Sequence, residues 1–176
     1  MAGGVIALLA VWGALLLHLS GQADVVVGVP HSMRHLDELR PIVGMFVNTL
    51  PLRLTQSDEC ITDSIRATQR VAGRALQHAH VPLHRIVAAR GVDRTASYSA
   101  LFQTMFHANA VRRSVLIEGA AGGIDEPTVK VDLEMELLCC EGEVYGRLIY
   151  DSAIYNGATV RKWIGCFAAV LWRAVE

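Results

Sequence analysis

Seven histidines offer this 176-residue sequence its most direct route to general-base chemistry, because imidazole exchanges protons near neutral pH. A catalytic histidine also needs an orienting partner and a substrate proton within reach. No two of the seven are adjacent, and none forms a His/Glu pair with metal-ligand spacing. We interpret His78, His80 and His107 as structural or exposed residues, and we predict no catalytic residue and no metal site in this chain. The seven histidines are His18, His31, His35, His78, His80, His84 and His107.

Other reactive patterns are also missing. The four cysteines include no CxxC pair, so we interpret them as reduced, mostly buried thiols of a cytoplasmic protein. The sequence has no GxSxG elbow and no P-loop. Residues 119–123 (GAAGG) lack the flanking strand and helix of a phosphate loop, which favours a flexible turn. The cysteines are Cys60, Cys139, Cys140 and Cys166.

Charge and composition exclude further classes. Sixteen basic residues against 17 acidic ones give a net charge of -1, and no run of Lys or Arg indicates a nucleic-acid partner. Apolar residues make up 52% of the chain and charged residues 19%, as in an ordinary globular protein. We therefore expect one domain over residues 1–176.

The N-terminal segment is almost wholly apolar over residues 5–19 (VIALLAVWGALLLHL). A secretory signal would carry a basic residue before such a run, and a membrane span needs about 20 residues. Neither condition is met, so we expect a buried core helix and no membrane partner. Because this helix begins almost at Met1 without a capping residue, we also expect the chain to be truncated.

Two strands should follow this helix. Residues 25–27 (VVV) predict a buried strand that ends at the turn formers Gly28 and Pro30. Residues 44–54 alternate, with the aromatic residue and the leucines on one side. Pro51 cannot donate to a strand ladder, so this second strand should lie at a sheet edge or contain a bulge.

An amphipathic helix should begin at Thr55, because the residues from there to Asp58 have the spacing of a capping box. Its arginines recur at every fourth position, as Arg66, Arg70 and Arg74. We interpret this stripe as a solvated helix face, with an acidic partner as the alternative.

The C-terminal part of the chain predicts a hairpin and a last helix. Residues 131–137 (VDLEMEL) alternate as a half-buried strand with its acidic residues outward, and residues 144–150 form the return strand. Thr159 should cap the last helix, which has one apolar stripe. The expected fold class is mixed α/β (α+β), with helices packed on a mixed β-sheet.

Five blocks in consistent order resemble the condensation domains of nonribosomal peptide synthetases. Residues 44–50 (GMFVNTL), followed by Arg53, resemble the family's GxFVNTLxxR block. Residues 20–30 (SGQADVVVGVP) are similar to its SGQxDVVVGxP segment. Three weaker matches follow, of which the first departs from the family's Pro-Phe-Glu at Leu83 and His84. They are residues 80–83 (HVPL), 101–106 (LFQTMF) and 148–155 (LIYDSAIY), whereas residues 93–97 match too poorly to carry any role.

This resemblance implies a chloramphenicol acetyltransferase-like lobe, the C-terminal one of two that enclose a tunnel. In the family, carrier proteins deliver thioesters on phosphopantetheine arms, and an acceptor amine attacks the donor thioester. The HHxxxDG motif credited with positioning or deprotonating that amine is absent from this sequence. The resemblance therefore implies tunnel or family-motif residues without a catalytic one. They are Gly44, Phe46, Val47, Asn48, Arg53 and Pro82.

We expect the chain to contribute to amide-bond formation between carrier-bound thioesters only when an N-terminal lobe is supplied, so its status as an enzyme is left open. Its partners would be peptidyl carrier proteins and the N-terminal lobe or neighbouring synthetase domains, with phosphopantetheine on the carriers and no cofactor on this chain. We place Phe46 and Asn48 near the lobe interface and expect Arg53 to be structural or ion-pairing. The alternatives are a non-catalytic carrier-binding module and an acyltransferase of the same fold.

Overall fold

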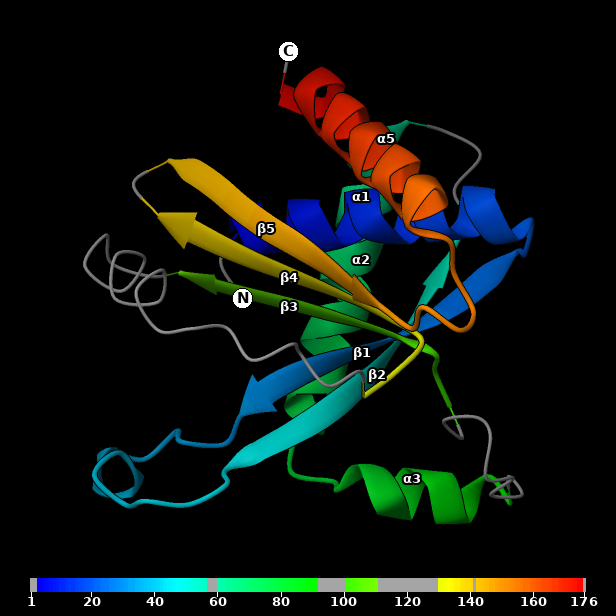
Figure 1. The fold of residues 1–176 in the computed structure, drawn as a ribbon. Coiled ribbons are helices and arrows are strands. Elements are labelled where there is room, and N and C mark those ends of the chain that lie inside the picture. The colour runs from blue at the N-terminus through cyan, green and yellow to red at the C-terminus, as the bar shows by residue number, and fades with distance from the viewer. Residues whose placement is uncertain (1–2, 57–59, 92–100, 111–129, 141, 176) are drawn as a thin grey trace.

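The structure is a computed structural model that describes residues 3–56, 60–91, 101–110, 130–140 and 142–175. Within these residues, the centre of the fold is a five-stranded sheet in the order β2-β1-β3-β4-β5 (Figure 1). Its inner pairings, β1 with β3 and β3 with β4, are parallel, and its outer pairings are antiparallel. The mixed α+β class predicted from the sequence is confirmed.

Strands β1 (Asp24–Ser32) and β2 (Val47–Thr55) pair along their whole length. β2 lies at the sheet edge, so Pro51 occupies the kind of strand that tolerates a missing donor, as predicted. The prediction that β1 ends at Gly28 and Pro30 is wrong. The strand continues because β2 supplies a pairing partner for each of these residues.

Strands β3 (Thr104–Ala110), β4 (Leu133–Cys140) and β5 (Glu143–Tyr150) complete the sheet. The predicted hairpin of β4 and β5 is confirmed, with Cys140 opposite Glu143 at its tip. Gly142 lies in this turn with φ of 86°, a conformation that glycine adopts without the steric cost of a Cβ atom.

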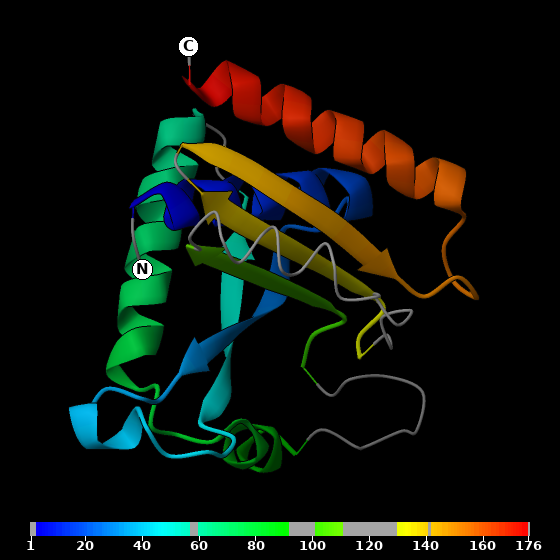
Figure 2. The same cartoon turned by 60° about the vertical axis from the view of Figure 1, so that its left-hand side comes forward.

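Four helices are described: α1 (Gly3–Ser20), α2 (Ile61–Gln77), α3 (Leu83–Ala89) and α5 (Gly157–Val175). A short 3-10 turn, η1 (Asp37–Leu39), lies in the β1–β2 connection. In both views, α3 and this connection lie at one end of the molecule and α5 lies at the other (Figures 1 and 2).

One hydrophobic core joins a face of the sheet to α1, α2 and α5. Alternate residues of each strand face it, which explains the alternation predicted in β2 and β4. α1 contributes to this core along most of its length, and Trp12 is completely buried. The strand residues of the core are Val27, Val29, Leu50, Leu52, Leu54, Phe106, Leu133, Met135, Leu137 and Leu148.

α1 is long and apolar enough to cross a membrane by length and composition, and half of it is buried inside the protein. Its buried residues pack against sheet and helix side chains of the core. The same two properties describe the core helix of a soluble protein, so they are weak support for a membrane span.

Both predicted helix starts are wrong. Thr55 is the last residue of β2, and Cys60 is the N-cap of α2. In α5, Thr159 already lies inside the helix, and Asn156 caps it by accepting the Ala158 N–H at 2.8 Å. Pairing with β1 takes Thr55 into the strand, so the capping-box spacing has no structural counterpart there.

Two burial predictions also need correction. Glu134 points away from the core as predicted, but only 8% of it is exposed, because Met105 and Ile149 flank it on neighbouring strands. The cysteines are all free thiols, yet Cys60 and Cys166 are exposed. Cys60 is the N-cap of α2 and Cys166 lies on the outer side of α5, so both lie outside the core.

Candidate functional site

Asn48 joins the edge strand β2 to the connection between α2 and α3. Its amide Nδ2 donates to the carbonyl oxygens of Ala79 and Val81, both at 2.8 Å. Its Oδ1 accepts the Leu83 N–H at 3.2 Å. All three contacts are to backbone groups 31 to 35 residues away, so Asn48 fixes the path of the chain between the two helices.

Pro82 lies within the segment that Asn48 holds. It is the N-cap of α3 with an extended backbone, and its side chain provides no hydrogen bond to the helix. The first N–H groups of a helix have no partner inside it. The Oδ1 atom of Asn48 satisfies the Leu83 N–H and thereby supplies the cap that Pro82 lacks.

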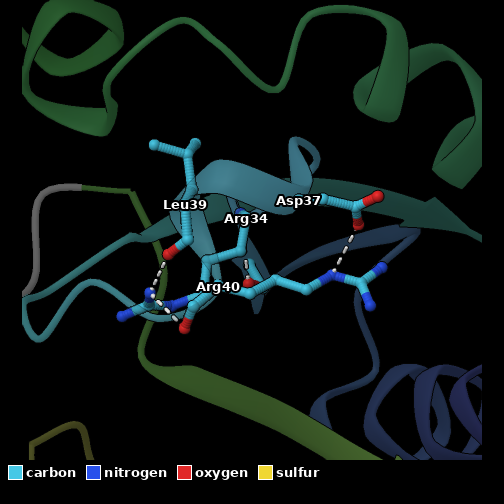
Figure 3. A network of polar contacts seen from close by, with 5 residues as sticks. Arg34, Asp37, Leu39 and Arg40 are labelled. Atoms are coloured by element: carbon cyan, nitrogen blue, oxygen red, sulfur yellow. Dashed lines mark hydrogen bonds and ion pairs between the residues drawn. The ribbon is translucent and has the colours of Figure 1, made fainter.

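Arg34 organises the connection between β1 and β2. No sequence pattern identified this residue. Its guanidinium donates to the carbonyl oxygens of Leu39, Ile42 (2.7 Å) and Gly44 (2.9 Å), with a longer contact to Arg40 at 3.4 Å. Figure 3 shows Arg34 reaching toward Leu39 and Arg40 while Arg40 pairs with Asp37. Contacts from one side chain to backbone carbonyls up to ten residues away leave no spacing signal in a sequence.

The first residues of the GMFVNTL block belong to this connection and not to β2, where the sequence placed them. The Arg34 guanidinium lies over the Phe46 ring, 4.4 Å from its centre, a cation–π arrangement. Gly44 contributes its carbonyl oxygen to the same arginine. Val47 begins β2 opposite Ser32.

An apolar rim is exposed around this arginine-held connection. Val43 is 99% exposed and Met45 is 90% exposed. Exposed large apolar side chains that gather in and next to one connection are typical of a surface that another protein part covers. The members of the rim are Leu36, Ile42, Val43, Met45 and Val47.

Arg53 forms an ion pair with Asp24 across β1 and β2, with Nη2 2.7 Å from Oδ2. The hydrogen bond from Arg53 holds the pKa of the Asp24 carboxyl below its ordinary value. The same bond raises the pKa of Arg53. Both side chains are solvent-accessible and lie at the far end of β2 from Asn48, so Arg53 belongs to a separate part of the strand.

The side chains of Asn48 and Arg34 fix backbone geometry in the described part of the chain. Within the described residues, no three His, Cys, Asp or Glu side chains are arranged to hold a metal ion. His80 lies in the segment that Asn48 holds, and its ring centre is 6.4 Å from that of His78, without a described acidic partner. Two segments considered in the sequence lie outside the described residues: the poor family match at residues 93–97 and the glycine-rich residues 119–123.

The chain is similar in sequence to known proteins. A model of the condensation domain family matches residues 5–176. Nonribosomal peptide synthetase agiA of Aspergillus flavus is 33% identical over 173 residues, and malpinin synthetase of Mortierella alpina is 31% identical over 169 residues. These matches cover 94% and 93% of this chain but only 2% of each synthetase, so the chain spans a small part of its relatives.

Solved structures share the fold. The condensation domain of monacolin K polyketide synthase MokA superposes with a TM-score of 0.78 at 22% identity, over 95% of this chain and 40% of that one. The four-domain nonribosomal peptide synthetase holo-AB3403 gives a TM-score of 0.86 at 20% identity, over 97% of this chain and 14% of that one. The chloramphenicol acetyltransferase-like fold is thus confirmed. With a family match over nearly its whole length, the chain belongs to the condensation domain family of nonribosomal peptide synthetases.

Proposed function

We propose that this chain is the C-terminal lobe of a condensation domain and that it contributes to amide-bond formation between carrier-bound thioesters when an N-terminal lobe is present. The observation that carries the proposal is coverage: nearly the whole chain corresponds to 40% of the MokA condensation domain. The sequence also lacks the HHxxxDG motif that the family uses for the acceptor amine. In this proposal the reacting groups come from outside the chain.

The role of the chain would then be to shape one side of the tunnel. The apolar rim supports this, because Val43 and Met45 are almost fully exposed and would be covered by an opposing lobe. Arg34 holds the rim in place through backbone carbonyls, so it would present a preformed surface. Asn48 would act as a positioning residue, since its amide is already occupied by backbone partners.

The partners of the proposed lobe are peptidyl carrier proteins, the N-terminal lobe and neighbouring synthetase domains. Phosphopantetheine would be carried by the carrier proteins and enter the tunnel with its thioester. The free thiols of the described cysteines support a cytoplasmic location, where disulfides seldom persist.

A lobe exchange tests the proposal. Residues 5–176 replace the C-terminal lobe of an active condensation domain, and peptide formation is measured with loaded carrier proteins by mass spectrometry. We expect a folded chimera to form the peptide, and Met45→Asp to lower turnover more than the same change at Ile154, an exposed residue of the β5–α5 connection. A chimera that melts cooperatively, retains the HHxxxDG motif and forms no peptide contradicts the proposal.

Asn48 offers a second readout in the same chimera. Asn48→Ala should lower both the melting temperature and turnover, because the α2–α3 connection loses three hydrogen bonds. If folding and turnover are both unchanged, Asn48 has no positioning role.

The missing HHxxxDG motif favours one second candidate, a binding module that docks carriers or another chain without chemistry. Sequencing the transcript upstream of Met1 distinguishes the two. An open frame that continues into an HHxxxDG motif supports the catalytic lobe. A stop codon directly before Met1 supports the binding module.

A further inference from the structure

A basic surface covers α2, α3 and the segment between them. Residues 64–91 contain five arginines and three histidines but no aspartate or glutamate. All eight basic side chains are exposed. The members of the basic surface are Arg66, Arg70, Arg74, His78, His80, His84, Arg85 and Arg90.

Most of this charge is unpaired within the described part of the chain. Arg66 contacts the Asp63 carboxylate at 3.0 Å, one turn earlier in α2. Arg70, Arg74, Arg85 and Arg90 have no ion pair with a described residue. The elements packed against α2 and α3 do not neutralise them: α1 has no acidic residue, and the only charged residue of β2, Arg53, pairs with Asp24.

The arginines of α2 form a row and not a pocket. Residues four positions apart lie on one helix face and are separated by about 6 Å along the axis. The row from Arg66 to Arg74 therefore extends about 12 Å, beyond the reach of a single phosphate or carboxylate. Its length matches a partner with several acidic groups at a similar repeat.

The surroundings of the row favour a protein partner over a lipid surface. Helices that bind membranes combine basic residues with large apolar side chains that enter the acyl region. The large apolar side chains that are exposed in the described structure include none between residues 60 and 91. On the inner side of α2, Ala72 is buried in the core, so the helix cannot turn an apolar face outward.

We propose that the basic surface docks an acidic protein face, with Arg70 and Arg74 at its centre. The charges needed are already exposed and held on a helix that the core anchors. The inference stands apart from the condensation chemistry, since it requires no N-terminal lobe and no thioester.

Binding of a defined probe to the full chain tests the proposal. The probe is a fluorescent 21-residue helical peptide with glutamate at every fourth position, and its counterpart has glutamine at those positions. We expect anisotropy to report binding of the glutamate peptide at least tenfold tighter than the glutamine peptide. Binding should weaken steeply between 20 mM and 300 mM salt, because exposed charges are screened over this range.

A matched pair of variants locates the surface. Arg70→Gln/Arg74→Gln should weaken glutamate-peptide binding at least tenfold. Arg161→Gln/Arg173→Gln removes the same charge from the exposed side of α5 and should change it less than twofold. Circular dichroism and melting curves establish that both variants fold like the parent chain, as expected for exposed side chains.

Three results overturn the proposal. The first is equal loss in the two double variants, since net charge alone would then explain binding. The second is equal affinity for the two peptides. The third is tighter binding to phosphatidylglycerol vesicles or to a DNA duplex than to the glutamate peptide, with the same Arg70/Arg74 dependence, which would assign the surface to a lipid or nucleic-acid partner.

Discussion

At the end of the molecule where α1 and α5 meet, stability comes from apolar contact. Trp12 is fully buried there and meets Phe167 edge to face, with the ring centres 6.2 Å apart. We call this the apolar end. At the opposite end, α3 and the β1–β2 connection are held by Asn48 and Arg34, which bond to backbone groups far along the chain. We call this the hydrogen-bonded end.

The family-motif residues, with the exception of Arg53, lie at the hydrogen-bonded end. Apolar packing accepts many combinations of side chains with similar volume. A side chain that satisfies two carbonyls and one N–H at fixed positions has few substitutes, because each hydrogen bond restricts both distance and direction. Gly44, Phe46, Asn48 and Pro82 all lie at the hydrogen-bonded end, where geometry and not chemistry would demand their identity.

The largest expected effect comes from the apolar end. Trp12→Ala should lower the free energy of unfolding by about 3–5 kcal/mol, because it removes a buried aromatic side chain and leaves a cavity. Urea denaturation followed by circular dichroism measures the change. Trp12→Phe is the control: it keeps an aromatic ring and removes an indole N–H that has no hydrogen-bond partner among the described residues. Equal losses in the two variants would mean that ring packing contributes little here.

A smaller and more local effect is expected at the hydrogen-bonded end. Asn48→Ala should cost about 2–3 kcal/mol, since three hydrogen bonds of about 1 kcal/mol each are lost at a partly buried position. In hydrogen-exchange measurements, the Leu83 N–H should lose more protection than the fall in global stability explains. The amides of the core strands should lose only as much protection as that fall explains. Asn109→Ala, at an exposed strand position, should change stability by less than about 0.5 kcal/mol. Loss of Leu83 protection in that control would contradict the assignment.

Replacing two glycines by alanine distinguishes a steric effect on stability from an effect of backbone conformational freedom. A Cβ atom at Gly28 would lie 2.5 Å from the Phe102 ring, so Gly28→Ala should destabilise the sheet by about 1–3 kcal/mol. A Cβ atom at Gly73 in α2 would meet nothing within 4 Å, so Gly73→Ala should stabilise the protein by about 0.5–1 kcal/mol. Melting temperatures should therefore shift in opposite directions, and a shift in the same direction would contradict the close packing of Phe102 on Gly28.

Prediction from sequence succeeded where one repeated physical requirement acts on many residues. The alternation of Leu50, Leu52 and Leu54 predicts their common burial, because a strand with one core face repeats every two residues. The hairpin of β4 and β5 follows from the same requirement. The predicted helix start at Thr55 was wrong because this residue pairs with β1, a contact that no local spacing encodes.

The candidate site was predictable only in part, for the same reason. Resemblance identified Asn48 as a residue of interest, but its hydrogen bonds reach residues 79–83, and no spacing within the sequence implies them. Arg34 escaped notice because its partners are backbone carbonyls, which every residue offers. Local sequence patterns therefore do not identify side chains whose partners are distant backbone groups.

The smallest expected effect concerns the exposed ion pair of Arg53 and Asp24, which lies outside both ends. Arg53→Met should raise the pKa of Asp24 toward its ordinary value, because the hydrogen bond that lowers it is lost. Since the folded-state pKa of Asp24 lies below its unfolded value, the pair's contribution is present above the unfolded pKa of about 4 and is lost as pH falls through the folded pKa. An NMR titration of the Asp24 carboxyl carbon in both proteins measures the shift, and Arg40→Met, which breaks a separate exposed pair with Asp37, should leave it unchanged. An Asp24 titration that is the same with and without Arg53 would show that solvent screens the pair completely.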